Sequence, residues 1–146
     1  MEVRVKTIQQ LLEAKGHEVC SVSPDTPVYD ALGLMAERGI GALMVCREER
    51  PVGIMSERDY ARKVILAGRA SKETPVGDIM TTRVVCTSPQ RTVEECMALM
   101  TDKRVRHLPV IDHKKLVGIV SIGDLVKAII HEQQFIIEQL EHYITS

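Results

Sequence analysis

The sequence predicts a mixed α/β fold, of the α+β kind, in which a strand–helix–strand–strand–helix subdomain occurs twice. Two observations carry this prediction: a long internal repeat, and short apolar runs that alternate with helix-type apolar patterns. The chain has 146 residues, of which 45% are hydrophobic and 27% are charged. This is an ordinary globular balance, and the length suffices for one domain or two very small ones.

The repeat has a period of 65 residues. A shift of that size aligns residues 19–59 with residues 84–124 without a gap, and thirteen of the 41 paired positions are identical. Chance does not readily produce an ungapped match of this length, so we interpret it as two copies of one subdomain. We expect residues 1–75 to hold an N-terminal helix, the first subdomain and a polar linker. Residues 76–146 then hold the second subdomain with an extended C-terminal helix.

Local signals mark each element of the first copy. Residues 19–22 read as a short extended piece, and Gly39 ends the helix that follows it. The apolar run 42–46 predicts a strand covered on both faces, and a charged turn leads from it into strand 52–55. Ser56 then opens the last helix of this copy.

The second copy repeats this order and ends in a longer helix. Thr92 and Glu95 predict a capping box at a helix start, and Pro109, which lacks an N–H donor, predicts an edge strand. The final helix extends from about Ser121 to about Tyr143. An apolar face continues along it past the end of the repeat, which indicates that a partner subunit or the N-terminal helix covers it.

Composition excludes several classes of function. The net charge is −1, so no electrostatic basis exists for general nucleic-acid or membrane binding. Aromatic residues make up 3% of the chain, too few for a base-stacking surface. We find neither an apolar signal core nor a membrane-length run, and expect a cytoplasmic protein.

The histidines and cysteines show no metal-ligand spacing with one another, so we expect no metal site. The four cysteines each lie in an apolar run without a CxxC motif, and we expect buried reduced thiols. They are Cys20, Cys46, Cys86 and Cys96.

Each copy contains a Ser-x-x-Asp turn between its last strand and its last helix. Ser56 and Asp59 form the first turn, and Ser121 and Asp124 form the second. One interpretation is structural, because serine followed by an acid three residues later is close to a helix capping box. The other is functional, because an ionised carboxylate can accept hydrogen bonds from both hydroxyls of a ribose. Both roles can coexist on one carboxylate.

The doubled pattern resembles a tandem pair of cystathionine β-synthase (CBS) domains. The segments that carry the resemblance are residues 41–45 and 51–59 in the first copy and residues 106–112 and 116–124 in the second. Residues 56–63, Ser-Glu-Arg-Asp-Tyr-Ala-Arg-Lys, are also similar to small stand-alone bacterial CBS-pair proteins. The resemblance implies two β-α-β-β-α subdomains related by pseudo-two-fold symmetry and a disc-like homodimer.

The resemblance further implies a non-catalytic sensor of adenosyl compounds, with no obligatory cofactor. AMP is the first expectation, with ADP, ATP, S-adenosylmethionine and NAD(H) as alternatives. Such ligands bind in two clefts between the repeats, and the aspartate of each turn contacts the ribose. Carried over residue by residue, site 1 consists of Ser56, Arg58, Asp59, Val85, Cys86, Arg106 and His107. Site 2 consists of Cys20, Ser21, Gly41, Ala42, Ser121, Gly123 and Asp124.

The two implied sites differ in positive charge. Site 1 has Arg58 where site 2 has Gly123, and it has Arg106 and His107 where site 2 has Gly41 and Ala42. Arginine forks bind phosphate, so we expect site 1 to hold a phosphorylated ligand more tightly.

Two other classes of function stay open. The chain could be a structural interaction protein whose clefts are vestigial and whose C-terminal helix binds the partner. It could also be an enzyme acting on a nucleotide, although the sequence shows no pair of residues spaced for general acid–base catalysis. The effector protein that would receive a signal is not identified by any motif.

Overall fold

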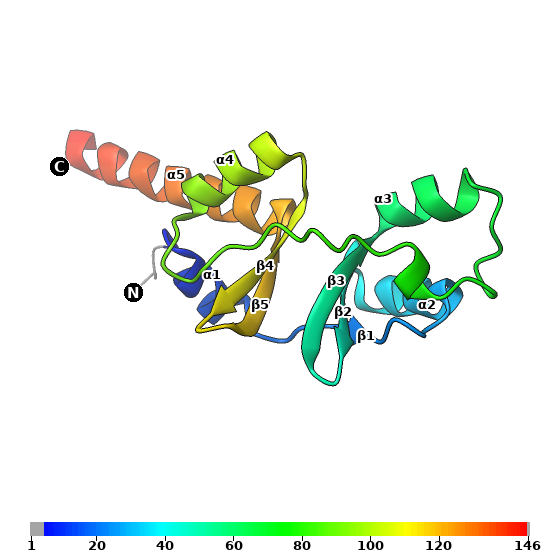
Figure 1. Cartoon of the computed structure of the whole chain (residues 1–146). Coiled ribbons are helices and arrows are strands. Elements are labelled where there is room, and N and C mark those ends of the chain that lie inside the picture. The colour runs from blue at the N-terminus through cyan, green and yellow to red at the C-terminus, as the bar shows by residue number, and fades with distance from the viewer. Residues whose placement is uncertain (1–4, 146) are drawn as a thin grey trace. The chain divides into compact units, whose positions relative to one another are not determined.

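The computed structural model describes residues 5–145, with side chains to residue 144, and they form two compact units (Figure 1). Unit 2 is the continuous stretch Val19–Val84, and unit 1 combines Met1–Glu18 with Val85–Ser146. The division differs from the boundary expected after residue 75. The N-terminal helix belongs with the second repeat, and the segment after the linker belongs with the first.

Unit 2 is built on a three-stranded sheet in the order β1-β2-β3. β1 (Ser21–Val22) pairs in parallel with β2 (Ala42–Arg47), and β2 pairs antiparallel with β3 (Arg50–Ser56). The first four residues of β2 are buried, as its continuous apolar sequence predicts.

The helices of unit 2 cover this sheet. α2 (Val28–Arg38) ends at Gly39, whose left-handed φ of 64° confirms the predicted stop. α3 (Glu57–Tyr60) starts after Ser56 and continues through a π-helical turn, η1 (Ala61–Ile65). A short 3-10 helix, η2 (Val76–Asp78), completes the unit. The core consists of Val28, Ala31, Met35, Leu43, Val45, Met55, Val64, Val76 and Ile79.

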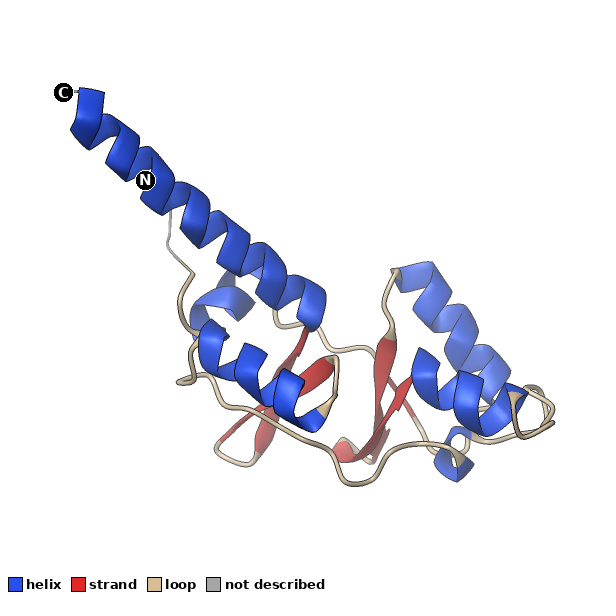
Figure 2. Cartoon of the chain, turned by 90° about the horizontal axis from the view of Figure 1, so that it is seen from above, coloured by secondary structure: helices blue, strands red, loops and turns tan. Residues whose placement is uncertain are grey.

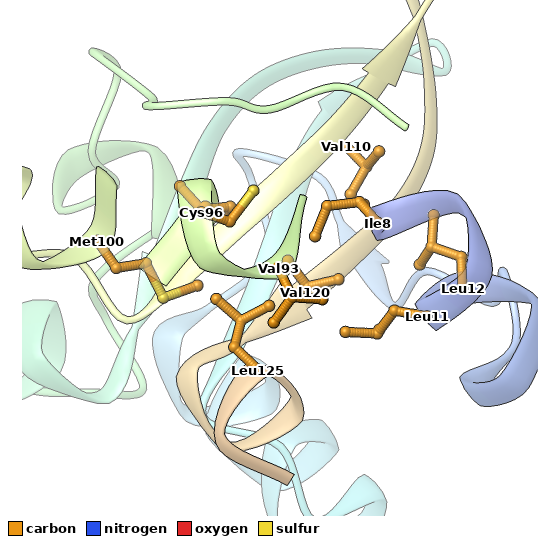
Figure 3. Packing of buried hydrophobic residues seen from close by; sticks show 10 residues of the cluster. Ile8, Leu11, Leu12, Val93, Cys96, Met100, Val110, Val120 and Leu125 are labelled. Carbon is orange, nitrogen blue, oxygen red and sulfur yellow. The ribbon is translucent and has the colours of Figure 1, made fainter. Parts of the chain in front are cut away.

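Unit 1 repeats the arrangement with a smaller sheet. α4 (Val93–Lys103) begins at the predicted capping box of Thr92 and Glu95, and β4 (His107–Asp112) pairs antiparallel with β5 (Lys115–Ser121). α5 (Ile122–Thr145) follows, and α1 (Ile8–Lys15) packs into the same core. Figure 3 shows this core, which comprises Ile8, Leu11, Leu12, Val93, Cys96, Met100, Leu108, Val110, Val120 and Leu125.

The counterpart of β1 in unit 1 is reduced to a single parallel bridge, between Thr87 and Val110. Proline explains the loss. In unit 2 the N–H of Met44 donates to the Cys20 carbonyl, and the repeat aligns Met44 with Pro109, which has no N–H. The sequence predicts an extended piece here, but only one of its residues pairs.

α1 occupies in unit 1 the place that η2 occupies in unit 2. The N–H of Ile8 donates to the Arg91 carbonyl at 2.9 Å, as the N–H of Val76 donates to the Thr26 carbonyl at 2.8 Å. The bond from Gln9 to Pro89 repeats that from Gly77 to Pro24, and the bond from Val93 to Lys6 repeats that from Val28 to Thr74. The structural repeat therefore extends beyond the ungapped sequence match.

α5 continues past the rest of unit 1 as one uninterrupted helix (Figure 2). Leu125 on its inner side is fully buried, whereas Ile130, Ile137 and Leu140 are 57%, 53% and 56% exposed. The N-terminal helix packs beside Leu125 and leaves these outer residues uncovered. Of the two covers expected for the apolar face, α1 is therefore ruled out for these positions.

The four cysteines are free thiols, as expected, but their burial differs. Cys96 is buried, Cys20 and Cys46 are half-buried, and Cys86 is exposed, so the expectation of burial is wrong for Cys86. Its counterpart in the repeat, Ser21 of β1, is exposed as well, so this position of the extended segment faces outward in both units. Among the described residues, no helix is long and apolar enough to cross a membrane.

Candidate functional site

The Ser56–Asp59 turn of unit 2 is a complete capping box. The Asp59 N–H donates to Ser56 Oγ at 3.2 Å, and the Ser56 N–H donates to Asp59 Oδ2 at 3.0 Å. The Ser56 hydroxyl lies 3.1 Å from the same carboxylate oxygen. The structural interpretation of this turn is thus confirmed.

The second oxygen of Asp59 is also occupied. Oδ1 accepts a hydrogen bond from the Thr81 hydroxyl at 3.1 Å and pairs with the Lys63 ammonium at 3.0 Å. A carboxylate offers about four acceptor positions, and these contacts use them all. The side chain is only 11% exposed. A ribose hydroxyl can reach Asp59 only if Thr81 or Lys63 releases it.

The Ser121–Asp124 turn of unit 1 has the same reciprocal bonds but a different third partner. The Ser121 N–H donates to Asp124 Oδ2 at 2.8 Å, and the Asp124 N–H donates to Ser121 Oγ at 3.1 Å. The Lys15 ammonium, from the last turn of α1, lies 2.6 Å from the same Oδ2.

Asp124 is the more open of the two aspartates. Its side chain is 27% exposed, and its Oδ1 accepts no hydrogen bond from any residue in the described part of the chain. Burial alone would raise the pKa of the Asp124 carboxyl. The hydrogen bond and charge of Lys15, together with the Ser121 N–H, outweigh burial and hold the pKa below its ordinary value. The carboxylate is therefore ionised at neutral pH.

Within each unit, residues predicted for site 1 lie beside residues predicted for site 2. In unit 1, His107 lies opposite Ser121 across the β4–β5 ladder, and the exposed Arg106 accepts the Ile122 N–H at its carbonyl at 2.9 Å. In unit 2, Ala42 lies opposite Ser56. The Gly41 carbonyl likewise accepts the N–H of the residue after Ser56, at 3.0 Å. Each unit thus brings some residues of both predicted sites together at the start of its last helix.

The remaining predicted residues lie on the extended segments and the helix starts. Ser21 pairs with β2, and Cys20 packs against the core of unit 2. Val85 packs against the core of unit 1. Arg58 on α3 and Gly123 on α5 are both exposed.

Unit 1 also carries a hollow of about 690 Å³ beside α4. Cys86 is the one predicted site residue in its wall, so this hollow does not coincide with the carboxylates. Its lining comprises Cys86, Thr87, Ser88, Arg91, Glu95, Cys96, Ala98 and Leu99.

Three partners of the carboxylates were missed as site residues. The sequence places Lys63 near site 1, four residues after Asp59 and one helical turn away, but not as a direct partner of its carboxylate. Thr81 and Lys15 lie 22 and 109 residues from their aspartates, and no local pattern marks them.

Comparison with known proteins identifies the family. The model of the CBS domain matches the chain twice, at residues 16–65 and 76–131. The chain therefore belongs to the family of CBS-domain proteins, as a tandem pair of CBS domains, and the predicted fold class is confirmed.

Several relatives are similar over most of this chain. It is 42% identical to the mitochondrial CBS domain-containing protein CBSX3 of Arabidopsis thaliana, over 94% of this chain and 71% of that protein. A solved structure described as a putative signal-transduction protein with CBS domains, from Burkholderia ambifaria, is 52% identical with a TM-score of 0.84. The match covers 87% of this chain and 96% of that one.

One relative is an enzyme, the inosine-5'-monophosphate dehydrogenase of Methanocaldococcus jannaschii. The identity is 34% over 85% of this chain, but the match covers only 24% of that enzyme. The similarity is thus confined to a quarter of the enzyme's length.

Proposed function

We propose that this protein is a non-catalytic regulatory module that binds an adenine nucleotide and signals through its own dimer or a partner protein. AMP is the first choice of ligand, with ATP or NAD(H) as alternatives, and no obligatory cofactor is needed. The observation that carries the proposal is the equivalent placement of Asp59 and Asp124 in the two CBS domains.

The chemistry of Asp124 supports ribose binding. Its Oδ1 accepts no hydrogen bond from the described residues, and its depressed pKa keeps it ionised. A ribose diol presents two hydroxyl donors, which such a carboxylate can accept. At Asp59 a ribose hydroxyl can bind only if Lys63 or Thr81 breaks its contact with the carboxylate. Further contacts to the ligand must therefore offset the free energy of the contact that is lost.

Phosphate contacts can supply that compensation at site 1. Arg58 and Arg106 are exposed guanidinium groups, and the corresponding positions of site 2 are glycines. Lys63, once released from Asp59, adds a further cation. We therefore expect AMP to bind more tightly than adenosine at site 1, with a smaller difference at site 2.

The non-catalytic part of the proposal draws support from the dehydrogenase relative. This chain matches 24% of that enzyme, which leaves most of the enzyme's length outside the similarity. The free thiols fit a reducing compartment such as the cytoplasm, which we include in the proposal.

A homodimer is part of the same proposal, and the exposed stripe on α5 supports it. Isoleucine and leucine side chains more than half exposed along one helix favour a protein partner over water. The stripe also favours the second candidate function, an interaction protein that works through α5 with unused nucleotide sites.

A thermal-shift panel tests the proposal directly. Purified protein is heated with AMP, ADP, ATP, S-adenosylmethionine, NAD or NADH. A ligand at a hundred times its dissociation constant should add about 2.7 kcal/mol to the free energy of unfolding. The shift should shrink in Asp59→Ala or Asp124→Ala and vanish in the double variant.

Glu57→Ala is the matched control, because it removes an exposed acid beside Asp59 that no capping bond uses. It should leave the shift unchanged. If none of the six compounds shifts the wild-type protein, the nucleotide-binding function is wrong and the interaction protein becomes the better candidate.

A further inference from the structure

In unit 1, Lys15 makes the two hydrogen bonds that correspond to those of Thr81 in unit 2. The Thr81 N–H donates to the Ile54 carbonyl at 2.8 Å, and its hydroxyl donates to Asp59. The Lys15 ammonium donates to the Ile119 carbonyl at 2.8 Å and also to Asp124. Ile119 is the counterpart of Ile54 in the repeat. One cation thus replaces two neutral donors.

The position of the cation also differs between the units. In unit 2 the charge on Asp59 is balanced by Lys63, one turn further along the same helical segment. The repeat places Ala128 at the corresponding position of α5, so no cation is available there. The balancing charge for Asp124 comes instead from α1, a separate helix.

Other contacts near Lys15 also hold the end of α1 against β5. Leu12 fills the space over Gly118, and His17 Nδ1 lies 3.0 Å from the Val117 carbonyl. The Gly16 N–H closes the helix on the Leu12 carbonyl. The Lys15–Asp124 ion pair directly joins the last residue of α1 to the first turn of α5.

We propose that Lys15 is an intrachain competitor for Asp124, so that a ribose-bearing ligand displaces it and releases the C-terminal end of α1. The inference rests on the proposed nucleotide function and adds a regulatory role for α1. A ribose diol donates one hydroxyl to each oxygen of a carboxylate, and Lys15 occupies Oδ2 of Asp124, so the diol can engage Oδ2 only by displacing Lys15. The ligand therefore binds more weakly than it would without Lys15, and its binding is coupled to α1.

The ion pair is partly exposed, with side-chain exposures of 36% for Lys15 and 27% for Asp124. Such pairs are screened by salt. Adenosine carries no charge, so salt acts on its binding mainly through this pair. Raising the salt concentration should therefore strengthen adenosine binding to the wild-type site.

The experiment measures adenosine binding by calorimetry in an Asp59→Asn background, which leaves Asp124 as the ribose acceptor. Lys15→Met should tighten binding about fivefold and abolish the salt effect. Lys115→Met is the matched control. It removes the same charge from unit 1 at the far end of β5, and it should leave both quantities unchanged.

Hydrogen exchange supplies a second measurement that does not depend on a variant. Adenosine should speed exchange of the Gly16 amide, which bonds to the end of α1, in wild type. Unchanged or weaker adenosine binding in Lys15→Met would overturn the competition.

The Asp124→Asn protein, which retains Asp59, separates the two proposals. If AMP binds to it while Lys15→Met has no effect on adenosine binding at Asp124, only the inference about Lys15 is wrong. If no adenine compound binds to the wild type or to any variant, the nucleotide function is wrong as well.

Discussion

At the scale of single residues, two aspartates in the same Ser-x-x-Asp pattern have different surroundings. Both follow a serine by three residues and both close a capping box. Asp59 is nearly buried with both oxygens engaged, whereas Asp124 retains an open oxygen. The Ser-x-x-Asp pattern predicts the local bonds, because these depend on neighbours in the chain. It cannot predict the third partner, because that residue arrives through tertiary packing.

The lowered pKa of Asp124 gives a pH dependence of stability. Because the folded pKa lies below the unfolded value of about 3.9, the stabilisation is fully present above about pH 4 and is lost as pH falls through the folded pKa. Asp124→Asn should therefore lower the free energy of unfolding at pH 7, by about 1 kcal/mol or less for a partly exposed pair.

Urea denaturation at pH 7 and pH 3 measures this difference. It should be smaller at pH 3, because the carboxylate of the unfolded chain, with a pKa of about 3.9, is largely protonated there. Asp102→Asn is the control, since Asp102 is exposed and its nearest lysine contact is 3.9 Å. An equal loss at both pH values would contradict the ionic origin of the stabilisation.

At the scale of elements, a glycine on each last strand admits the segment that packs over it. A methyl group on Gly53 would lie 2.9 Å from the Thr81 carbonyl oxygen and 2.7 Å from the Met80 sulfur. On Gly118 it would lie 2.7 Å from the end of the Leu12 side chain. The atoms beside Gly53 include a backbone carbonyl, which cannot rotate away, whereas the atoms beside Gly118 belong to a leucine side chain.

Gly53→Ala should therefore cost more stability than Gly118→Ala. Overpacking of this kind costs about 1–3 kcal/mol, and we expect Gly53→Ala in the upper part of that range. Denaturant unfolding of both variants measures the two losses. Gly33→Ala, on α2 with nothing within 4 Å of the added methyl, should be neutral or stabilising. A larger loss for Gly118→Ala than for Gly53→Ala would contradict the argument.

The elements were largely predictable, and the failures have identifiable causes. Strand and helix positions follow from apolar periodicity, and the Thr92 cap follows from two residues. The reduced strand near Val85 was not anticipated, because the consequence of Pro109 appears only when its partner strand is known. The unit to which α1 belongs was also missed. The sequence shows an apolar face on α1, formed by Ile8, Leu11 and Leu12, but it does not indicate which sheet this face covers.

At the scale of the whole molecule, the exposed stripe on α5 predicts self-association. A double variant, Ile137→Asp with Leu140→Asp, places charges on this stripe and should shift the protein from dimer to monomer. Burial of each such side chain contributes about 1.5–3 kcal/mol, so the dissociation constant should rise more than a hundredfold.

Analytical ultracentrifugation at several concentrations measures the change. Gln139→Asp is the control, because it adds a charge between the two positions but replaces a polar residue. A wild-type chain that sediments as a monomer would contradict the dimer. A double variant that remains dimeric would assign the stripe to another partner.

The split of unit 1 has a consequence for how the chain is made. Unit 2 is continuous, so it can fold as soon as Val19–Val84 has left the ribosome. α1 is synthesised before its sheet, which comes from residues after Val85, and can dock only when that sheet has formed. The N-terminal helix is therefore among the last elements to dock. Deleting it would leave unit 2 intact while removing Ile8, Leu11 and Leu12 from the core of unit 1.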